Sequence, residues 1–159
     1  MGRKGFTLIE LITVIVIIGI IIGMTAPFIT TMLDAWVFNR TERDIVFSGR
    51  MSMNRMVREI RQIRNASSIT TFTPTEFSFL KIDNTSITFG QSGNRLLFNS
   101  DELTNKLQNP GGLNFTYLDE NASITGLLNN IRMVRIRLIL ESGDSSLDLE
   151  SLARFRNPG

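Results

Sequence analysis

The stretch Gly5-Phe6-Thr7-Leu8-Ile9-Glu10 opens the part of the chain that decides the fold, and an almost unbroken apolar run follows over residues 11–24. This arrangement places one carboxylate, that of Glu10, inside a segment that otherwise favours lipid. An unpaired carboxylate at membrane depth costs about 2.5–3.5 kcal/mol even on the mildest insertion scales. The sequence therefore predicts that Glu10 has a partner, and that this pairing bears on function.

The whole-chain composition excludes several classes of chemistry. The 159 residues are enough for one domain with a modest core and one membrane segment, and they include neither Cys nor His. Disulfides, thiolate metal sites, Cys nucleophiles and His acid–base catalysis are thus excluded. The 17 Lys and Arg exceed the 15 Asp and Glu only because of Arg3 and Lys4, which precede the apolar run. The overall charge gives no argument for nucleic acid.

Residues 6–28 are long enough to cross a bilayer, because a hydrocarbon core requires about 20 apolar residues in a helix. The positive charges of Arg3 and Lys4 predict a cytoplasmic N-terminus, which leaves residues 34–159 outside. An ordinary secretory signal peptide fits poorly, since its small-residue site would be followed directly by Pro27. A plain single-pass anchor explains neither Glu10 nor the short leader.

The leader of residues 1–5, the Phe6-to-Glu10 segment and the apolar run that ends at Pro27 together resemble the class III signal of type IV pilins and pseudopilins. The resemblance implies that the membrane aspartyl prepilin peptidase cuts between Gly5 and Phe6 and methylates the new amine of Phe6. It further implies assembly with other pilins or pseudopilins, and contact with membrane lipid and an inner-membrane assembly platform.

The resemblance makes Glu10 the acidic residue of the mature N-terminus, and the physical chemistry agrees with that role. The amine created at Phe6 is a cation that Glu10 can pair with, either in one helix at i, i+4 spacing or on a neighbouring subunit, where it would set axial register. An unpaired Glu10 tolerated near the interface is the alternative. Gly19 and Gly23 can let helices approach closely, although glycine is common in membrane helices. Pro27 predicts a helix kink or local unwinding.

Residues 29–65 predict an amphipathic helical shaft. From Asp34 to Arg64, apolar or small residues recur at helical spacing and form one stripe. They are Phe38, Ile45, Gly49, Met53, Met56, Ile60 and Ile63. We therefore expect one helix from Phe6 to about Arg64, apolar all round in its first half and amphipathic in its second. The second half needs a partner sheet to cover its stripe.

Seven arginines decorate the rest of this shaft, which raises the possibility of nucleic-acid binding. Residues 34–64 carry seven cations and four anions, whereas residues 65–159 carry eight cations and ten anions. A solvated face, or a contact between the basic shaft and the acidic head of neighbouring subunits, explains this pattern better. The aromatic residues Trp36, Phe38 and Phe47 suit an interface anchor and a core rather than base stacking. Nucleic acid is not an expected partner.

Residues 66–159 predict a β-rich globular head, because short Phe-, Ile- and Thr-rich runs alternate with turn-forming clusters. The predicted strands are residues 69–73, 76–82, 86–89, 96–99, 113–118 and 133–141. Residues 144–159 are ambiguous between a loop and a last edge strand near residues 152–155. Asp144, Asp148 and Glu150 could suggest Ca²⁺, but they lack the spaced loop of an EF-hand, so a solvated acidic tail is preferred.

The predicted fold class is α+β, with a long N-terminal helix packed on an antiparallel β-sheet, as in pilins. Its segments are the leader (1–5), a transmembrane helix (6–28), the helical shaft (29–65) and the head (66–159). An arginine-rich shaft and strand pairs, followed by the ending Arg154-Phe155-Arg156-Asn157, resemble J-type minor pseudopilins of type II secretion and W-type minor pilins of type IV pili. That finer resemblance rests on no sharp motif.

These features predict a structural subunit with no catalytic residues, cofactor or metal. After processing it would sit in the bacterial inner membrane, with its head outside the cytoplasm, and enter a type II secretion pseudopilus at or near the tip. The alternative is a minor pilin of a type IV or competence pilus, with a role in binding DNA or an exported substrate. A membrane-anchored hydrolase is disfavoured by the missing His, Cys and paired-carboxylate signatures.

Overall fold

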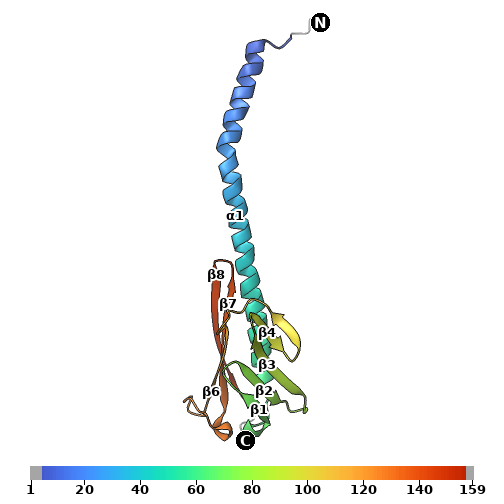
Figure 1. Cartoon of the computed structure of the whole chain (residues 1–159), viewed down its shortest axis with the longest axis vertical. Helices are drawn as coiled ribbons and strands as arrows, with labels where there is room; N and C mark the ends of the chain where they lie inside the picture. The colour runs from blue at the N-terminus through green and yellow to red at the C-terminus, as the bar shows by residue number, and fades with distance from the viewer. Residues whose placement is uncertain (1–4, 157–159) are drawn as a thin grey trace. The chain divides into compact units, whose positions relative to one another are not determined.

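The structure is a computed structural model, and it describes residues 5–156 of the chain. The predicted leader, except for Gly5, therefore lies outside the described residues, as do Asn157 and the last two positions. By its contacts the chain divides into two compact units, with the boundary between Arg40 and Thr41. The first unit is helical, and the second holds the rest of the helix and every strand (Figure 1).

One helix, α1 (Leu8–Ile60), contains both the apolar run and the shaft. It begins two residues later than predicted, since Thr7 caps its first turn. It ends about four residues earlier than predicted, because Ile63 already forms a β-bridge with Lys81 and is therefore in extended chain. The hydroxyl groups of Thr30 and Thr31 donate to the Pro27 carbonyl at 2.9 and 3.0 Å.

The local unwinding that Pro27 predicted is wrong, since the described residues on both sides of this proline are helical. Proline removes one backbone hydrogen-bond donor from the helix. The many hydrogen bonds on both sides of Pro27 are enough to keep the helix continuous. A kink at Pro27 without loss of helix stays a prediction.

The second unit contains a five-stranded antiparallel sheet in which each strand pairs with the next along the chain. Its strands are β1 (Ile69–Phe72), β2 (Glu76–Leu80), β3 (Ser86–Ser92), β4 (Arg95–Phe98) and β5 (Asp101–Thr104). The first four match the predicted strands closely. The turn between β3 and β4 holds Gly93 in the left-handed region, at a φ of 63°. Sequence patterns missed β5, because this edge strand is only four residues long and begins with two carboxylates.

A second, three-stranded antiparallel sheet completes the unit. Its strands are β6 (Leu113–Leu118), β7 (Met133–Ser142) and β8 (Ser145–Arg154), in that order. The ambiguous C-terminal region is thus a ten-residue edge strand, which begins well before residue 152. The tight turn at Gly143, with a φ of 58°, lets β8 return along the whole of β7.

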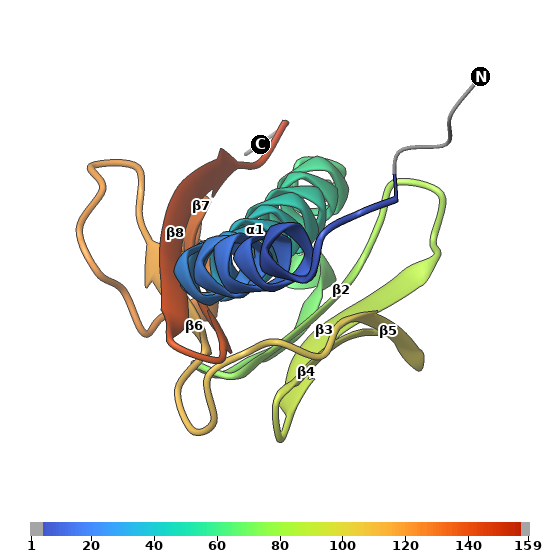
Figure 2. The ribbon, with the colours of Figure 1, turned by 90° about the horizontal axis from the view of Figure 1, so that it is seen from above.

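The hydrophobic core lies where α1 meets the two sheets. Figure 2 shows residues 41–60 of α1 running between the sheet that contains β2 and β3 and the sheet formed by β6, β7 and β8. Ile60 and Met56 of the helix stripe belong to one buried cluster with Ile136 and Leu138 of β7. The predicted joining of helix stripe and strand is confirmed, as is the α+β, pilin-like fold class. Phe38 is the exception in the stripe, since half of its surface is exposed.

The two sheets are joined by hydrogen bonds as well as by side-chain packing. The amide of Phe115 in β6 donates to the Pro74 carbonyl at 2.7 Å, and the Tyr117 hydroxyl donates to the Thr73 carbonyl at 2.7 Å. Burial of Tyr117 raises the pKa of its phenol above the ordinary value. The phenol therefore remains a neutral donor at every physiological pH, which suits a structural bond.

Candidate processing and assembly site

The predicted cleavage junction lies just before the helix begins. Gly5, Phe6 and Thr7 are outside regular secondary structure, and 85% of the Phe6 surface is exposed. Among the residues that the structure describes, a Cβ added at Gly5 would meet nothing within 4 Å. The fold thus places no steric demand on Gly5, and a requirement for a small residue there would have to come from a processing enzyme.

Thr7 and Glu10 form a reciprocal capping box at the start of α1. The Thr7 amide donates to Oε2 of Glu10 at 3.1 Å, and the Thr7 hydroxyl donates to the same oxygen at 3.0 Å. The Glu10 amide in turn donates to the Thr7 hydroxyl oxygen at 3.4 Å. Such a pair satisfies two backbone donors that the first helical turn leaves without partners.

The capping box was missed at the sequence level, although its Thr-x-x-Glu spacing is a recognised sequence signal. It gives Glu10 an intramolecular partner, so this carboxylate is not simply an unpaired charge. Both members follow the predicted cleavage point, and the box would therefore survive removal of residues 1–5. An ionised carboxylate offers about four acceptor sites on its two oxygens. Glu10 thus retains capacity for a second donor, such as an amine.

The first unit exposes apolar side chains on every side. Residues such as Ile9, Ile15 and Ile22 have more than half of their surface exposed. The helix α1 is long and apolar enough to cross a membrane, judged by length and composition alone. A soluble protein rarely leaves such a continuous apolar surface uncovered. The segment therefore suits lipid or the matching helices of other subunits.

Gly19 and Gly23 lie on this exposed helix, and added side chains would meet nothing within 4 Å. These glycines therefore have open space beside them among residues 5–156. A close approach of a second helix would use them, as small residues permit in membranes. The binding of a second helix at Gly19 and Gly23 stays a prediction.

A buried carboxylate, Glu59, was also missed by the sequence reading. It lies on α1, is only 7% exposed, and pairs with Lys81 at 3.5 Å and Arg58 at 3.7 Å. Lys81 also pairs with Asp83 at 3.7 Å. A Glu beside Ile60 interrupts the apolar pattern, but the partner Lys81 lies on a distant strand end and could not be found from helical spacing. The cluster ties the helix end to the first sheet.

Several charges of the head also have structural partners. Arg55 lies over the ring of Phe98 at 4.1 Å from its centroid, so this shaft arginine packs against β4. On the other sheet, Arg137 in β7 donates from Nε to both carboxylate oxygens of Asp148 in β8, each at 3.1 Å. These bonds hold the pKa of Asp148 below its ordinary value and raise the pKa of Arg137.

The same pairing bears on the suggested Ca²⁺ site. In the register of β7 and β8, Arg137 lies opposite Glu150 and Ile139 lies opposite Asp148. The ion pairs are therefore diagonal: Arg137 pairs with Asp148, and Arg135 pairs with Glu150 at 3.3 Å. Within residues 5–156, no group of three or more His, Cys, Asp or Glu side chains is placed to hold a metal ion. Asp148 and Glu150 of the acidic tail therefore take part in ion pairs between β7 and β8.

Comparison with known proteins bears on the N-terminal segment. Residues 1–26 match the sequence model of the prokaryotic N-terminal methylation motif. Searches of curated proteins and of solved structures gave no match to the chain. The motif is the class III signal of type IV pilins and pseudopilins, so the resemblance seen in the sequence is confirmed at this level. The finer resemblance to J-type or W-type subunits stays a prediction.

The motif supports a type IV pilin-like or pseudopilin protein, and the long N-terminal helix packed on an antiparallel β domain agrees with that class. Its motif suggests a structural subunit rather than an enzyme, and a membrane anchor formed by the apolar helix. A protein of this type implies assembly with other pilins and processing by prepilin peptidase.

Proposed function

We propose that the protein is a minor pseudopilin, a structural subunit of a type II secretion pseudopilus with a role at or near its tip. The observation that supports this most is the methylation motif over residues 1–26. It coincides with an exposed Gly5-Phe6 junction and with a helix whose large apolar side chains are exposed in its first half.

In this proposal the prepilin peptidase cuts between Gly5 and Phe6, and Phe6 becomes the methylated first residue. Residues 6–28 anchor the subunit in the inner membrane, with residues 34–159 on the far side from the cytoplasm. The shaft (29–65) and the head (66–159) then carry the contacts with other subunits and with the assembly platform. Glu10 pairs with the Phe6 amine of a neighbour and sets the axial register.

The experiment that tests this proposal is mass spectrometry of the membrane form, made in cells with and without a prepilin peptidase. We expect the peptidase to remove residues 1–5 and leave an N-methylated Phe6. The variant Gly5→Leu should stay uncut, although the structure shows open space around Gly5, because the limit on size comes from the enzyme. An intact Met1 on the unaltered chain in cells that contain the peptidase would overturn the proposal.

A minor pilin of a type IV or competence pilus is the second candidate. Its support is the arginine content of the shaft, which could serve DNA or an exported substrate. Phosphate binding weakens steeply as salt rises, so DNA affinity measured against salt distinguishes this candidate. A neighbouring secretin and secretion ATPase gene cluster would favour the pseudopilus, whereas genes for pilus retraction or DNA uptake would favour the pilus.

A further inference from the structure

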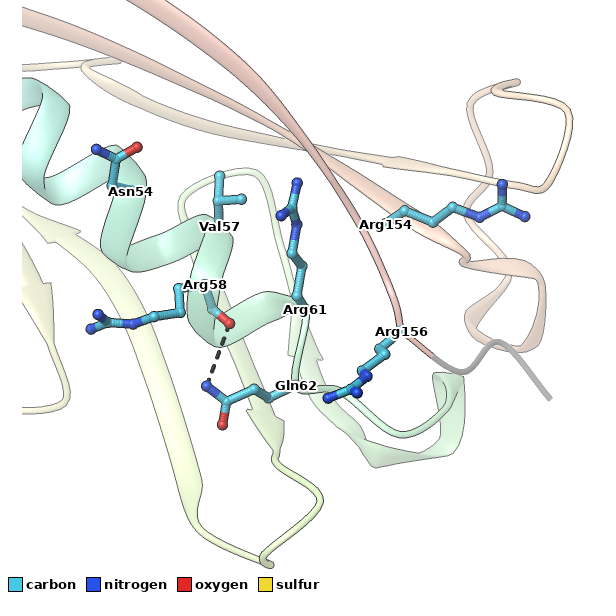
Figure 3. Close-up of a pocket in the computed structure, with 7 residues that line it drawn as sticks. All are labelled: Asn54, Val57, Arg58, Arg61, Gln62, Arg154 and Arg156. Atoms are coloured by element: carbon cyan, nitrogen blue, oxygen red, sulfur yellow. Dashed lines mark hydrogen bonds between the residues drawn. The ribbon is translucent and has the colours of Figure 1, made fainter.

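A recess of about 500 Å³ lies between the C-terminal end of α1 and the end of β8, and arginines dominate its rim. Arg58 and Arg61 come from the helix, whereas Arg154 and Arg156 come from the end of the last strand and the residues after it. Asn54, Val57 and Gln62 complete the lining (Figure 3). All these residues belong to the second compact unit.

The arginines that line this recess differ in direction. Figure 3 shows the Arg156 side chain directed toward the helix end where Arg61 and Gln62 lie, whereas Arg58 and Arg154 point outward. The side-chain amide of Gln62 donates from Nε2 to the backbone carbonyl of Arg58 at 3.5 Å, which positions this side chain. Arg61 and Arg156 thus line the recess from two different segments, the helix end and the residues after β8.

Among residues 5–156, three of these four cations have no ion-pair partner. Among residues 5–156, the ion pairs include Arg58, which contacts Glu59 at 3.7 Å, but none of Arg61, Arg154 or Arg156. The acidic residues of β8, Asp148 and Glu150, form ion pairs with arginines of β7. Gathering like charges without anions opposes compaction, so the arrangement carries a cost within the isolated chain.

A purely structural explanation accounts for only part of the cluster. Basic residues in the last turn of a helix interact favourably with its C-terminal dipole, and this covers Arg58 and Arg61. It does not explain why β8 ends with two more arginines beside the same helix end. The buried Ala153 and Phe155 already fix the strand there, so Arg154 and Arg156 are exposed side chains that folding does not require.

We propose that this recess binds a short acidic segment of a partner protein, with carboxylates on Arg61 and Arg156 and an apolar side chain against Val57. Guanidinium groups match carboxylates through paired hydrogen bonds. Val57 is half-buried at the wall of the recess, and it gives an apolar neighbour of the carboxylates a place to pack. The phosphodiester group of a nucleic acid carries no apolar side chain that could pack against Val57. The recess is also compact, whereas duplex recognition spreads over a protein surface of roughly 600 Å² or more even for single modules.

The test uses the full chain in detergent micelles and fluorescence anisotropy. The probe is a fluorescein-labelled pentapeptide that alternates glutamate and leucine, compared with the same peptide carrying glutamine and with a single-stranded DNA oligonucleotide of matched charge. We expect the acidic peptide to bind at least about tenfold more tightly than the glutamine peptide, since each charge-assisted bond is among the stronger hydrogen bonds.

The double variant Arg61→Gln with Arg156→Gln should weaken binding of the acidic peptide by at least about tenfold. The matched control is Arg50→Gln with Arg95→Gln, which removes the same charge from exposed positions outside the recess and should change affinity less than about twofold. Circular dichroism of both variants checks that the fold is retained.

Any of three results would overturn the proposal. Equal losses in the recess variant and the control variant would show that net charge, not this recess, attracts the peptide. Tighter binding of DNA than of the acidic peptide, lost in the recess variant alone, would show that the recess serves phosphates instead. Binding of the glutamine peptide as tightly as the acidic one would equally exclude recognition of carboxylates.

Discussion

The two halves of α1 form one continuous helix but meet opposite surroundings. Up to Arg40 the helix exposes its large apolar side chains, whereas from Thr41 onward it buries a stripe against both sheets. Ile45, Met56 and Ile60 are almost fully buried, while Ile15 and Ile22 are largely exposed. The contrast shows that the distribution of apolar residues around a helix determines what can cover it. A single apolar stripe packs on a sheet of the same chain, whereas a helix that is apolar on all sides requires lipid or other chains.

The contrast also separates two kinds of energetics. In the second half, burial of apolar surface stabilises the fold by about 25 cal/mol per Å² removed from water. In the first half, apolar side chains contribute free energy only when a membrane or a neighbouring subunit removes them from water. Substitutions in the first half should therefore change anchoring or assembly, and those in the second half should change unfolding. The predictions below test this division, beginning with the largest effect.

The variant Glu10→Ala should lower incorporation into filaments by at least about a hundredfold if Glu10 pairs with the amine of a neighbouring subunit, because a broken buried ion pair costs roughly 3–5 kcal/mol. Cleavage, insertion and the folded head should remain intact, since the hydrogen bonds of the Glu10 side chain are to Thr7 in the same helical turn. The measurement is crosslinking or co-purification with partner pilins, with a cleavage control.

The capping box provides a matched control for this experiment. Glu10→Gln retains a side-chain oxygen that accepts from the Thr7 amide, but it removes the charge. If the charge sets register, both variants lose assembly to a similar degree. Normal assembly of Glu10→Gln would show that Glu10 serves the helix cap alone, and the register proposal would fail. A tip subunit would be less sensitive, because it lacks a subunit ahead of it.

The second prediction compares two methionines of the same helix. Met56→Ala should lower the free energy of unfolding by roughly 2–5 kcal/mol, and Ile60→Ala should do the same, because both side chains are fully buried in the core. Met51 is 57% exposed, so Met51→Ala should change stability by less than about 0.5 kcal/mol. Denaturant unfolding of a fragment that begins at Asp34, which we predict to be a soluble monomer, measures all three.

Equal effects of Met56→Ala and Met51→Ala would mean that the wrong helix face has been assigned to the core. The fragment itself tests the comparison, because it lacks most of the first compact unit. Failure of the unaltered fragment to unfold cooperatively would show that residues 8–33 support the head, contrary to the division within α1.

The third prediction compares glycines of the two halves. A Cβ at Gly49 would lie 3.0 Å from Cδ1 of Leu149 and 3.1 Å from Cδ1 of Leu140, so Gly49→Val should destabilise the second unit by about 1–3 kcal/mol. Gly19 has open space around it, and Gly19→Val should leave unfolding of the head unchanged. Thermal melts of both full-length variants in micelles measure this. Equal destabilisation would show that the apolar half also packs within its own chain.

Sequence patterns predicted those parts of the fold that depend on local periodicity. The stripe from Ile45 to Ile63 and the alternation in β7 gave the core correctly, because both reflect one buried face. The helix start was placed too early because the Thr7–Glu10 cap was overlooked. The full extent of β8 could not be predicted from the sequence, because its acidic residues suggest a solvated segment. Only the pairing with β7 shows that arginines of β7 form ion pairs with them.

The candidate sites divide in the same way. The Gly5-Phe6 junction and Glu10 belong to a contiguous motif, so they could be proposed from the sequence alone, and their roles stay predictions. Lys81 as the partner of Glu59, and Arg156 as the neighbour of Arg61, come from segments far apart in the chain. Their juxtaposition depends on tertiary structure, and no spacing rule within one helix could reveal it.

The smallest effect expected is that of an exposed pair in the second sheet. Arg137 lowers the pKa of Asp148, so the stability from this pair is fully present above the unfolded pKa of about 3.9 and is lost as pH falls through the lower folded pKa. Asp148→Asn should therefore lower the denaturant midpoint slightly at pH 7, and the difference from the unaltered chain should vanish at strongly acidic pH.

Asp144→Asn is the matched control, because it removes a carboxylate from the same hairpin that takes part in none of the ion pairs among residues 5–156. It should leave the midpoint nearly unchanged at both pH values. Added salt should reduce the effect of Asp148→Asn, since both partners are about half exposed and solvent ions screen them. A difference that persists below the folded pKa, or grows as pH falls, would show that Asp148 acts through packing rather than charge. The pair would then stabilise β8 as the apolar stripe stabilises α1, and the division between surface charge and buried surface would need revision.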